Sequence, residues 1–251
     1  MHHAQSLVGS LGPGGTFLNR PLSGPEATRV EQRLRIDATN YLYSACVSIG
    51  DAIQAIDRSL YTWATVKLYY SGFYLLRSLL ALSGRALIYD DSKPRTLLCR
   101  SGEMPSALGG KIRGTHKAVI MYFTKSFPSS PLLSQNIGSE APFDWLMFRR
   151  EEANYAAGRF SDPAAPQHFA TIVRYGTRRS MAEYLTDKTY LYAFDPDHAM
   201  LALPIEALKQ VISHPNLDVA ANTDAGTQHF FRILFADRAG PMSDVLALLR
   251  V

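Results

Sequence analysis

The segment from Phe143 to Ala157 places polar side chains within an apolar helical stripe. At 100° per residue, one face of this helix carries a row of apolar residues. They are Phe143, Leu146, Met147, Ala153 and Ala157. Arg150 and Asn154 point out along the same face. Because a guanidinium keeps its proton, burying it without acceptors costs several kcal/mol. We therefore expect Arg150 to meet either a cleft or a carboxylate, such as Asp51 or Glu152.

These residue types limit the chemistry that the helix can do. Arginine stabilises negative charge, as on a phosphoryl group, whereas asparagine does not titrate near neutral pH and cannot transfer a proton. Tyr155 follows directly and could donate a proton only with a strongly lowered pKa. Three interpretations stay open for Arg150 with Asn154. They are a buried tie between helices, contact with a nucleic acid or nucleotide without cleavage, and cleavage.

Other basic and aromatic residues are candidates for nucleic-acid contact. Lys67 lies on a largely apolar helix, where its ammonium either reaches the surface, which we favour, or joins the polar cluster of Arg150. Arg174, Arg178 and Arg179 lie on a later helix, where a solvated face is favoured over phosphate binding. An aromatic cluster at helical spacing is more typical of a core than of a base-stacking platform. Its residues are Tyr69, Tyr70, Phe73 and Tyr74.

No sequence pattern indicates a metal or cofactor site. Four histidines are scattered singly, namely His116, His198, His214 and His229. Their spacing, and that of the pair His2-His3, matches no metal-binding helix or hairpin. The glycine-rich segment 12–15 lacks the lysine of a phosphate-binding loop. We therefore expect no metal and no cofactor.

The composition predicts a folded protein in a reducing compartment. The 251 residues are 47% hydrophobic, which is enough for a substantial core, and the net charge of +4 permits a polyanionic partner without requiring one. Cys46 and Cys99 form no CxxC pattern. The first residues show no basic patch followed by an apolar run, and the longest apolar stretches contain Lys67, Ser71 or Arg77. We therefore expect a cytoplasmic protein without a membrane segment.

The elements that must position these residues are mostly helical. Residues 1–27 are rich in glycine and proline and are predicted to form a flexible arm. Residues 28–251 are predicted to form a single helical domain, with a bundle core over about 28–185 and an extension over about 186–251. Apolar periodicity predicts helices over 30–57, 60–82, 115–127, 143–157, 167–185, 204–214, 227–236 and 242–249.

Short extended segments interrupt this helical pattern. Two apolar runs flank a polar loop over 90–94, which predicts a β-hairpin insertion over 86–99. Residues 190–194 are predicted to form a strand or an edge segment. The predicted fold class is therefore mainly α, a helical bundle with a small β-hairpin insertion and a C-terminal helical extension.

Two of these helices resemble those of a known family. The run WLMFRREEANYAAGRF at 145–160, followed by Ser161-Asp-Pro, resembles the later helix of the HEPN superfamily of all-helical prokaryotic domains. The run WATVKLYYSGFYLLRSLLAL at 63–82 is similar to the second bundle helix of such proteins. In catalytic members an arginine is followed a few residues later by a histidine, and paired subunits bring two copies together over RNA. The resemblance implies a metal-independent endoribonuclease in which the ribose 2′-hydroxyl attacks the adjacent phosphate.

Carried onto this chain residue by residue, the motif arginine matches Arg149 or Arg150, and Glu151 matches the polar residue that often follows it. Asn154 stands where the histidine is expected, and Tyr155 comes next. The resemblance therefore implies an RNA-interacting protein with weak cleavage or none, in a toxin–antitoxin or antiviral defence system, as a homodimer or with a partner protein. The alternative is a non-catalytic helical scaffold or interaction subunit of a larger complex.

Overall fold

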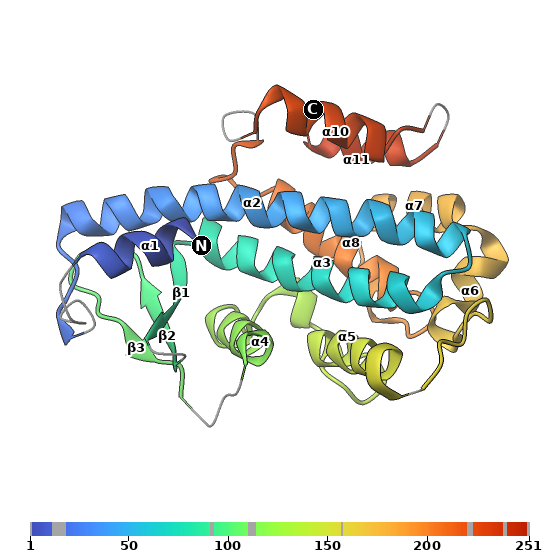
Figure 1. Ribbon diagram of the computed structural model, residues 1–251, viewed down its shortest axis with the longest axis horizontal. Coiled ribbons are helices and arrows are strands. Elements are labelled where there is room, and N and C mark those ends of the chain that lie inside the picture. Colours follow the sequence, from blue (N-terminus) through green and yellow to red (C-terminus); the bar gives the residue numbers. More distant parts are fainter. Residues whose placement is uncertain are drawn as a thin grey trace.

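The structure is mainly helical and is built around two long antiparallel helices. The computed structural model describes residues 2–11, 19–90, 93–109, 114–156, 158–219, 223–237 and 240–249. Helix α2 spans Gly24–Asp57, helix α3 spans Tyr61–Leu82, and the two lie side by side (Figure 1). Helix α3 also packs against three further helices, so it is the central helix of the bundle. These are α4 (Thr115–Ser126), α5 (Pro142–Glu151) and α8 (Ala199–Ile212).

Helix α2 begins earlier than the predicted start at residue 30. The backbone N–H of Ser23 donates to the Glu26 carboxylate over 2.9 Å, which completes a capping box. Pro25 lies in the first turn, where its missing N–H leaves no carbonyl unpaired. The glycine and proline that indicated an irregular arm therefore belong to the start of a helix.

A short helix precedes α2 and packs against it. Helix α1 spans His3–Ser10, with Ala4 and Val8 buried. The buried carboxylate of Asp37 on α2 accepts the backbone N–H groups of His3 at 2.8 Å and Ala4 at 2.9 Å, so it caps α1 from another helix. This part of the predicted flexible arm is therefore helical. The local sequence does not reveal the helix, because the residue that caps it lies more than 30 positions further along the chain. The glycine-rich segment 12–18 lies outside the described residues.

The predicted β-hairpin is confirmed, and a third strand extends it. Strands β1 (Arg85–Asp90), β2 (Lys93–Leu98) and β3 (Ser106–Ala107) form an antiparallel sheet in that order. Arg85 pairs with Leu98, and the register continues to the tip, where residues 91 and 92 lie outside the described part. The hydroxyl of Tyr122 on α4 donates to the carbonyl of Leu97 over 3.4 Å. The sheet therefore contacts α4, the helix that also borders the candidate site described below.

Two predicted helices are each divided into two segments in the structure. The helix predicted over 143–157 becomes α5 followed by a π-helical turn over Glu152–Ala156, a rarer geometry that recurs at functional sites. The helix predicted over 167–185 is two helices, α6 (Gln167–Tyr175) and α7 (Thr177–Thr186). They are separated by Gly176, whose φ of 89° suits glycine and ends α6.

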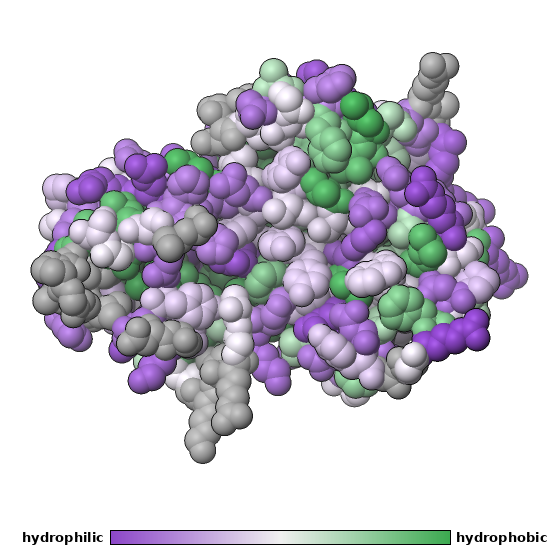
Figure 2. All heavy atoms as spheres, in the orientation of Figure 1, coloured by the Kyte–Doolittle hydropathy of each residue, from purple (hydrophilic) through white to green (hydrophobic). Residues whose placement is uncertain are grey.

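The C-terminal part is helical, as predicted. Residues 192–194 form a short 3₁₀ turn instead of a strand, and α8 starts at Ala199, before Pro204. Helix α10 (Ala225–Leu234) lies over α2, and helix α11 (Met242–Leu249) packs against α7 and α8 (Figure 1). Gly50 on α2 makes room for Leu234, because a Cβ at Gly50 would lie 2.5 Å from the Leu234 Cγ. Figure 2 shows apolar side chains gathered over these C-terminal helices.

The predicted fold class is confirmed: the protein is mainly α-helical, with a small antiparallel sheet. A 3₁₀ turn over Pro131–Leu133 links α4 to α5. Among the described residues, no helix combines the length and the apolar character needed to cross a membrane.

Candidate nucleic-acid interface on helix α3

Arg150 is buried between α5 and α3. The residue is 9% exposed, and its guanidinium carbon lies 4.9 Å from the centre of the Tyr69 ring. Its nearest ion-pair partner is the adjacent Glu151, at 3.8 Å, and not Asp51 or Glu152. The Arg150 Nε is buried and has no hydrogen-bond partner among the described residues. The positive charge is therefore covered by an aromatic face and only loosely balanced by a carboxylate.

His116, on α4, completes the surroundings of Arg150. Its Nδ1 lies 2.7 Å from the Tyr69 hydroxyl, and its ring centre lies 4.5 Å from that of Phe73. Burial, followed by the charges of Arg150 and Arg77, lowers the pKa of His116, so the imidazole is neutral near pH 7. We call Tyr69, His116 and Arg150 the Arg150 cluster. The sequence alone does not single out His116, because a single histidine at the start of a helix carries no local signal of its distant partners.

The other residues predicted on α5 do not join this cluster. Arg149 Nη1 pairs with Glu152 Oε2 at 2.5 Å, and its guanidinium lies 5.2 Å from the Trp145 ring. Asn154 is half-buried in the π-helical turn, whereas Tyr155 is 74% exposed. The buried Arg150 and the exposed Tyr155 therefore face different surroundings.

His168, on α6, packs behind α5 near Arg149. Its Nε2 lies 3.1 Å from the Thr65 hydroxyl, and its ring meets the edge of Trp145 at 6.3 Å. Burial, together with the nearby charge of Arg149, lowers the pKa of His168 to about 4. Two prolines separate His168 from α5 in the sequence, yet in the fold its ring packs against Trp145 of α5. Its lowered pKa keeps the imidazole neutral near pH 7.

One face of α3 carries an alternation of aromatic and basic side chains at the surface. Trp63, Lys67, Tyr70, Tyr74 and Arg77 follow one another at intervals of three or four residues, which places them on one side of the helix. Trp63 is 48% exposed, and the other four are half-buried. We call these five residues the α3 stripe. At 1.5 Å per residue the stripe is about 21 Å long.

Contacts within the α3 stripe and at its edges hold the rings in place. The Tyr70 and Tyr74 rings lie 6.1 Å apart, and Phe160 meets Trp63 edge-on at 5.8 Å. The His116 ring stands edge-on to Tyr70 at 5.5 Å, which joins the α3 stripe to the Arg150 cluster. The expectation of a purely apolar aromatic core is thus half right. Tyr69 and Phe73 are buried, whereas their neighbours Tyr70 and Tyr74 reach the surface.

Lys67 takes the position that the sequence favoured. Its ammonium reaches the surface and pairs with Asp51 of α2 at 2.7 Å. Both side chains are partly exposed, so water screens this pair. A phosphate can therefore compete with Asp51 for Lys67 at little cost.

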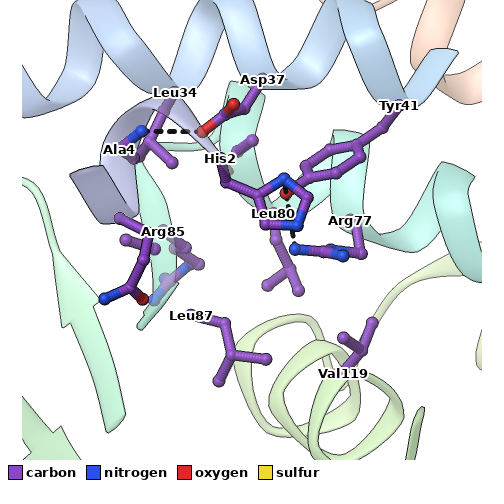
Figure 3. Close-up of a pocket in the computed structure, with 13 residues that line it drawn as sticks. His2, Ala4, Leu34, Asp37, Tyr41, Arg77, Leu80, Arg85, Leu87 and Val119 are labelled. Atoms are coloured by element: carbon purple, nitrogen blue, oxygen red, sulfur yellow. Dashed lines mark hydrogen bonds between the residues drawn. The ribbon is translucent and has the colours of Figure 1, made fainter. Parts of the chain in front are cut away.

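Arg77 ends the α3 stripe at a small cavity beneath α1 (Figure 3). Its Nη2 donates to the Tyr41 hydroxyl over 2.6 Å, and its guanidinium carbon lies 4.2 Å from the Tyr41 ring centre. The same hydroxyl lies 3.0 Å from Nδ1 of His2. The cavity, of about 30 Å³, has room for about one water molecule. Arg77 is thus fixed by an aromatic ring and a hydroxyl. Among the described residues no carboxylate forms an ion pair with it, although Asp37 lines the same cavity.

The second predicted basic group lies on α6 and α7. Arg178 pairs with Asp237 at 2.6 Å, and Arg179 pairs with Glu183 at 3.3 Å. The guanidinium groups of Arg174 and Arg179 lie 5.7 and 5.3 Å from the Tyr175 ring. These arginines form a patch of their own around Tyr175, on different helices from the α3 stripe.

The arrangement on α3 suits the binding of a flexible polyanion with aromatic groups. The exposed Trp63 ring and the half-buried rings of Tyr70 and Tyr74 offer surfaces for stacking, and Lys67 and Arg77 offer positive charges between and beyond them. Among the described residues, no three His, Cys, Asp or Glu side chains gather as a metal site would require. Among the described residues, the acid–base groups next to Arg150 are the hydrogen-bonded pair of Tyr69 and His116 and the carboxylate of Glu151 at 3.8 Å.

Comparison with protein-family models, with curated proteins and with solved structures gives no match for this chain. The resemblance to the HEPN superfamily therefore rests on the quoted residues alone.

Proposed function

We propose that the protein binds single-stranded RNA along the α3 stripe. The observation that carries this proposal is the regular succession of aromatic and basic residues, exposed or half-buried, on one face of α3. Base–aromatic stacking contributes about 1–3 kcal/mol per base and tolerates any sequence, because every base has a flat face. Phosphates between the bases would meet Lys67 and Arg77. The HEPN resemblance supports the same class of ligand.

The Arg150 cluster adds a third positive charge beside the stripe. The half-buried His116 lies next to Tyr70, at the middle of the stripe, and the buried Arg150 lies behind it, over the Tyr69 ring. A phosphate there would meet the His116 imidazole and the field of a guanidinium that Glu151 pairs with only loosely, at 3.8 Å. In this proposal Arg150 positions the strand, and the RNA approaches from the side of His116.

The same geometry favours binding over cleavage. Cleavage by the 2′-hydroxyl would need one group to take its proton and another to protonate the departing 5′-oxygen, leaving a 2′,3′-cyclic phosphate. Asn154 transfers no proton, and Tyr155 is far more exposed than the buried Arg150. We therefore propose that cleavage in the presence of a chelator is slow or absent. Cleavage lost in Arg150→Ala would instead make this cluster an active site.

The test is the anisotropy of a labelled short single-stranded RNA at low salt, where phosphate contacts are strongest. We expect Trp63→Ala to weaken binding by about thirtyfold, because one stacked base, worth about 2 kcal/mol, is lost. Tyr175→Ala is the matched control, because its ring is 50% exposed against 48% for Trp63 and also borders arginines. The proposal fails if wild type does not bind, or if Tyr175→Ala weakens binding as much as Trp63→Ala does.

A second function, as a subunit that pairs with its own copy, is favoured by the apolar surface of α10. Phe230 and Ile233 are exposed there, and Tyr43 of α2 lies beside Phe230 with ring centres 6.4 Å apart. An isolated apolar patch of this kind is typical of interaction sites. Measured molar mass in solution tests it. A dimer that Ile233→Asp dissociates supports this function, and a monomeric wild type at high concentration excludes it.

A further inference from the structure

An open groove lies where three helices end, on the other side of α3 from the stripe. Its walls come from the C-terminal turns of α3, α4 and α8 and from the Pro128–Pro131 segment. Its volume is about 640 Å³, within the range of about 300–1,000 Å³ that is usual for small-molecule sites. Leu79 and Ser83 line it, and Leu79 lies nine residues, or about 180° of helical rotation, beyond Tyr70 of the stripe. The groove and the α3 stripe are therefore separate surfaces.

The groove combines apolar walls with hydrogen-bonding groups at one end. Phe123 and Phe127 line it with their ring centres 5.2 Å apart, and Pro131 adds a flat apolar surface. Gln210 and His214, at the end of α8, add an amide and an imidazole. A ligand with a flat apolar body and one polar edge would satisfy both kinds of wall.

The charges around the groove exclude a charged ligand. The residues that line it, all within the described part, include no aspartate, glutamate, lysine or arginine. Burial lowers the pKa of His214, so its imidazole is neutral near pH 7. Three helix C-termini, each with partial negative charge on its carbonyl groups, disfavour an anion. The guanidinium of Arg85 lies 5.4 Å from the Phe127 ring and disfavours a cation.

We infer that this groove binds an uncharged aromatic small molecule, with its ring against Phe123 and Phe127 and its polar edge toward Gln210 and Ser213. Apolar burial of the ring supplies the free energy of binding. The hydroxyl and amide groups orient the edge by donating or accepting hydrogen bonds. This site is independent of RNA binding and needs neither the stripe nor the Arg150 cluster.

Three probes with the same ring and different charges test the inference by calorimetric titration near neutral pH. They are indole, indole-3-carboxylate and tryptamine. Indole should bind, and the anionic and cationic probes should bind at least about tenfold more weakly, because neither charge has a partner in the groove. Failure of indole to bind at millimolar concentration, or equal binding of a charged probe, would overturn the inference.

A variant locates the binding. Ser213 is exposed and lines the groove, so Ser213→Trp should fill it and weaken indole binding by at least about tenfold without unfolding the protein. Ser139→Trp is the matched control, because Ser139 is also exposed but does not line the groove. Thermal unfolding of both variants verifies that they fold. Indole binding that persists unchanged in Ser213→Trp, or that Ser139→Trp weakens equally, would place the ligand elsewhere and contradict the inference.

Discussion

The two sides of α3 offer opposite chemistry to a ligand. The α3 stripe exposes two cations among three aromatic rings, whereas the groove on the other side is lined by no acidic or basic side chain apart from a neutral histidine. Helix α4 borders both surfaces, with His116 near its start at the stripe and Ser126 and Phe127 at its end in the groove. A helix is partially positive at its start and partially negative at its end. Helices α3 and α4 therefore favour phosphate binding at the α3 stripe and disfavour it in the groove.

Removal of two rings of the stripe should have the largest effect and should separate the two surfaces. The double variant Trp63→Ala, Tyr74→Ala loses two stacked bases, at about 2 kcal/mol each, which takes micromolar RNA binding out of measurable range. Indole binding in the groove should stay at the wild-type value. Anisotropy with RNA and calorimetry with indole measure both. If the variant loses both ligands together, the two surfaces are not independent.

Low pH should destabilise the fold, so ligand binding to the two surfaces can be compared only near neutral pH. The pKa of His168 falls from 6.5 to about 4 on folding, so the unfolded chain takes up the proton first as the pH falls. Stability should therefore be lost between about pH 6.5 and pH 4, by about 3 kcal/mol. Urea unfolding at several pH values measures this loss. His168→Gln should reduce the pH dependence by about this amount and leave the part that comes from His2, His116 and His214, whose pKa values burial also lowers. An unchanged pH dependence in that variant would refute the assignment.

The charge of Arg77 should be visible in the salt dependence of RNA binding. Arg77→Ala removes one phosphate contact, which should lower the slope of log affinity against log salt by about 0.7 and weaken binding at low salt by about fivefold. Arg77→Lys should keep the slope, because the charge remains. Arg35→Ala, on α2 and paired with Glu31, is the control that should change neither. Equal slopes for wild type and Arg77→Ala would remove Arg77 from the interface.

The smallest expected effect is a gain in affinity. Asp51 pairs with Lys67 at 2.7 Å and lies beside the path proposed for the RNA. Asp51→Asn keeps the size of the side chain and frees Lys67, so RNA binding should tighten by about twofold to threefold. Indole binding should not change. Weaker RNA binding in Asp51→Asn would show that Lys67 faces away from the strand.

The sequence carried enough information for the helices that build the core. Apolar periodicity located α2, α3, α4, α5 and α11, because each buries one face or nearly all of its surface. Local rules failed where a distant residue decides the structure. Asp37 caps α1 from α2, across more than 30 residues, so the first helix looked like an arm.

The candidate site was only half visible in the sequence. Arg150 could be identified from the sequence, because an arginine in an apolar stripe breaks the pattern. Its contact with Tyr69, and the contact of Tyr69 with His116, join three helices and leave no local signal in the sequence. The α3 stripe was hidden for another reason. Aromatic residues surround α3 on all sides, and only the packing of α4 and α5 decides that Tyr69 is buried while Tyr70 reaches the surface.

The most direct measurement is photo-crosslinking of the full chain to a single-stranded RNA that contains 4-thiouridine, followed by mass spectrometry of the linked peptides. Our account predicts crosslinks on Trp63, Tyr70 and Tyr74, and their loss at high salt. Crosslinks that fall instead on Tyr175 and the arginines around it, or on no aromatic residue of α3, would contradict it.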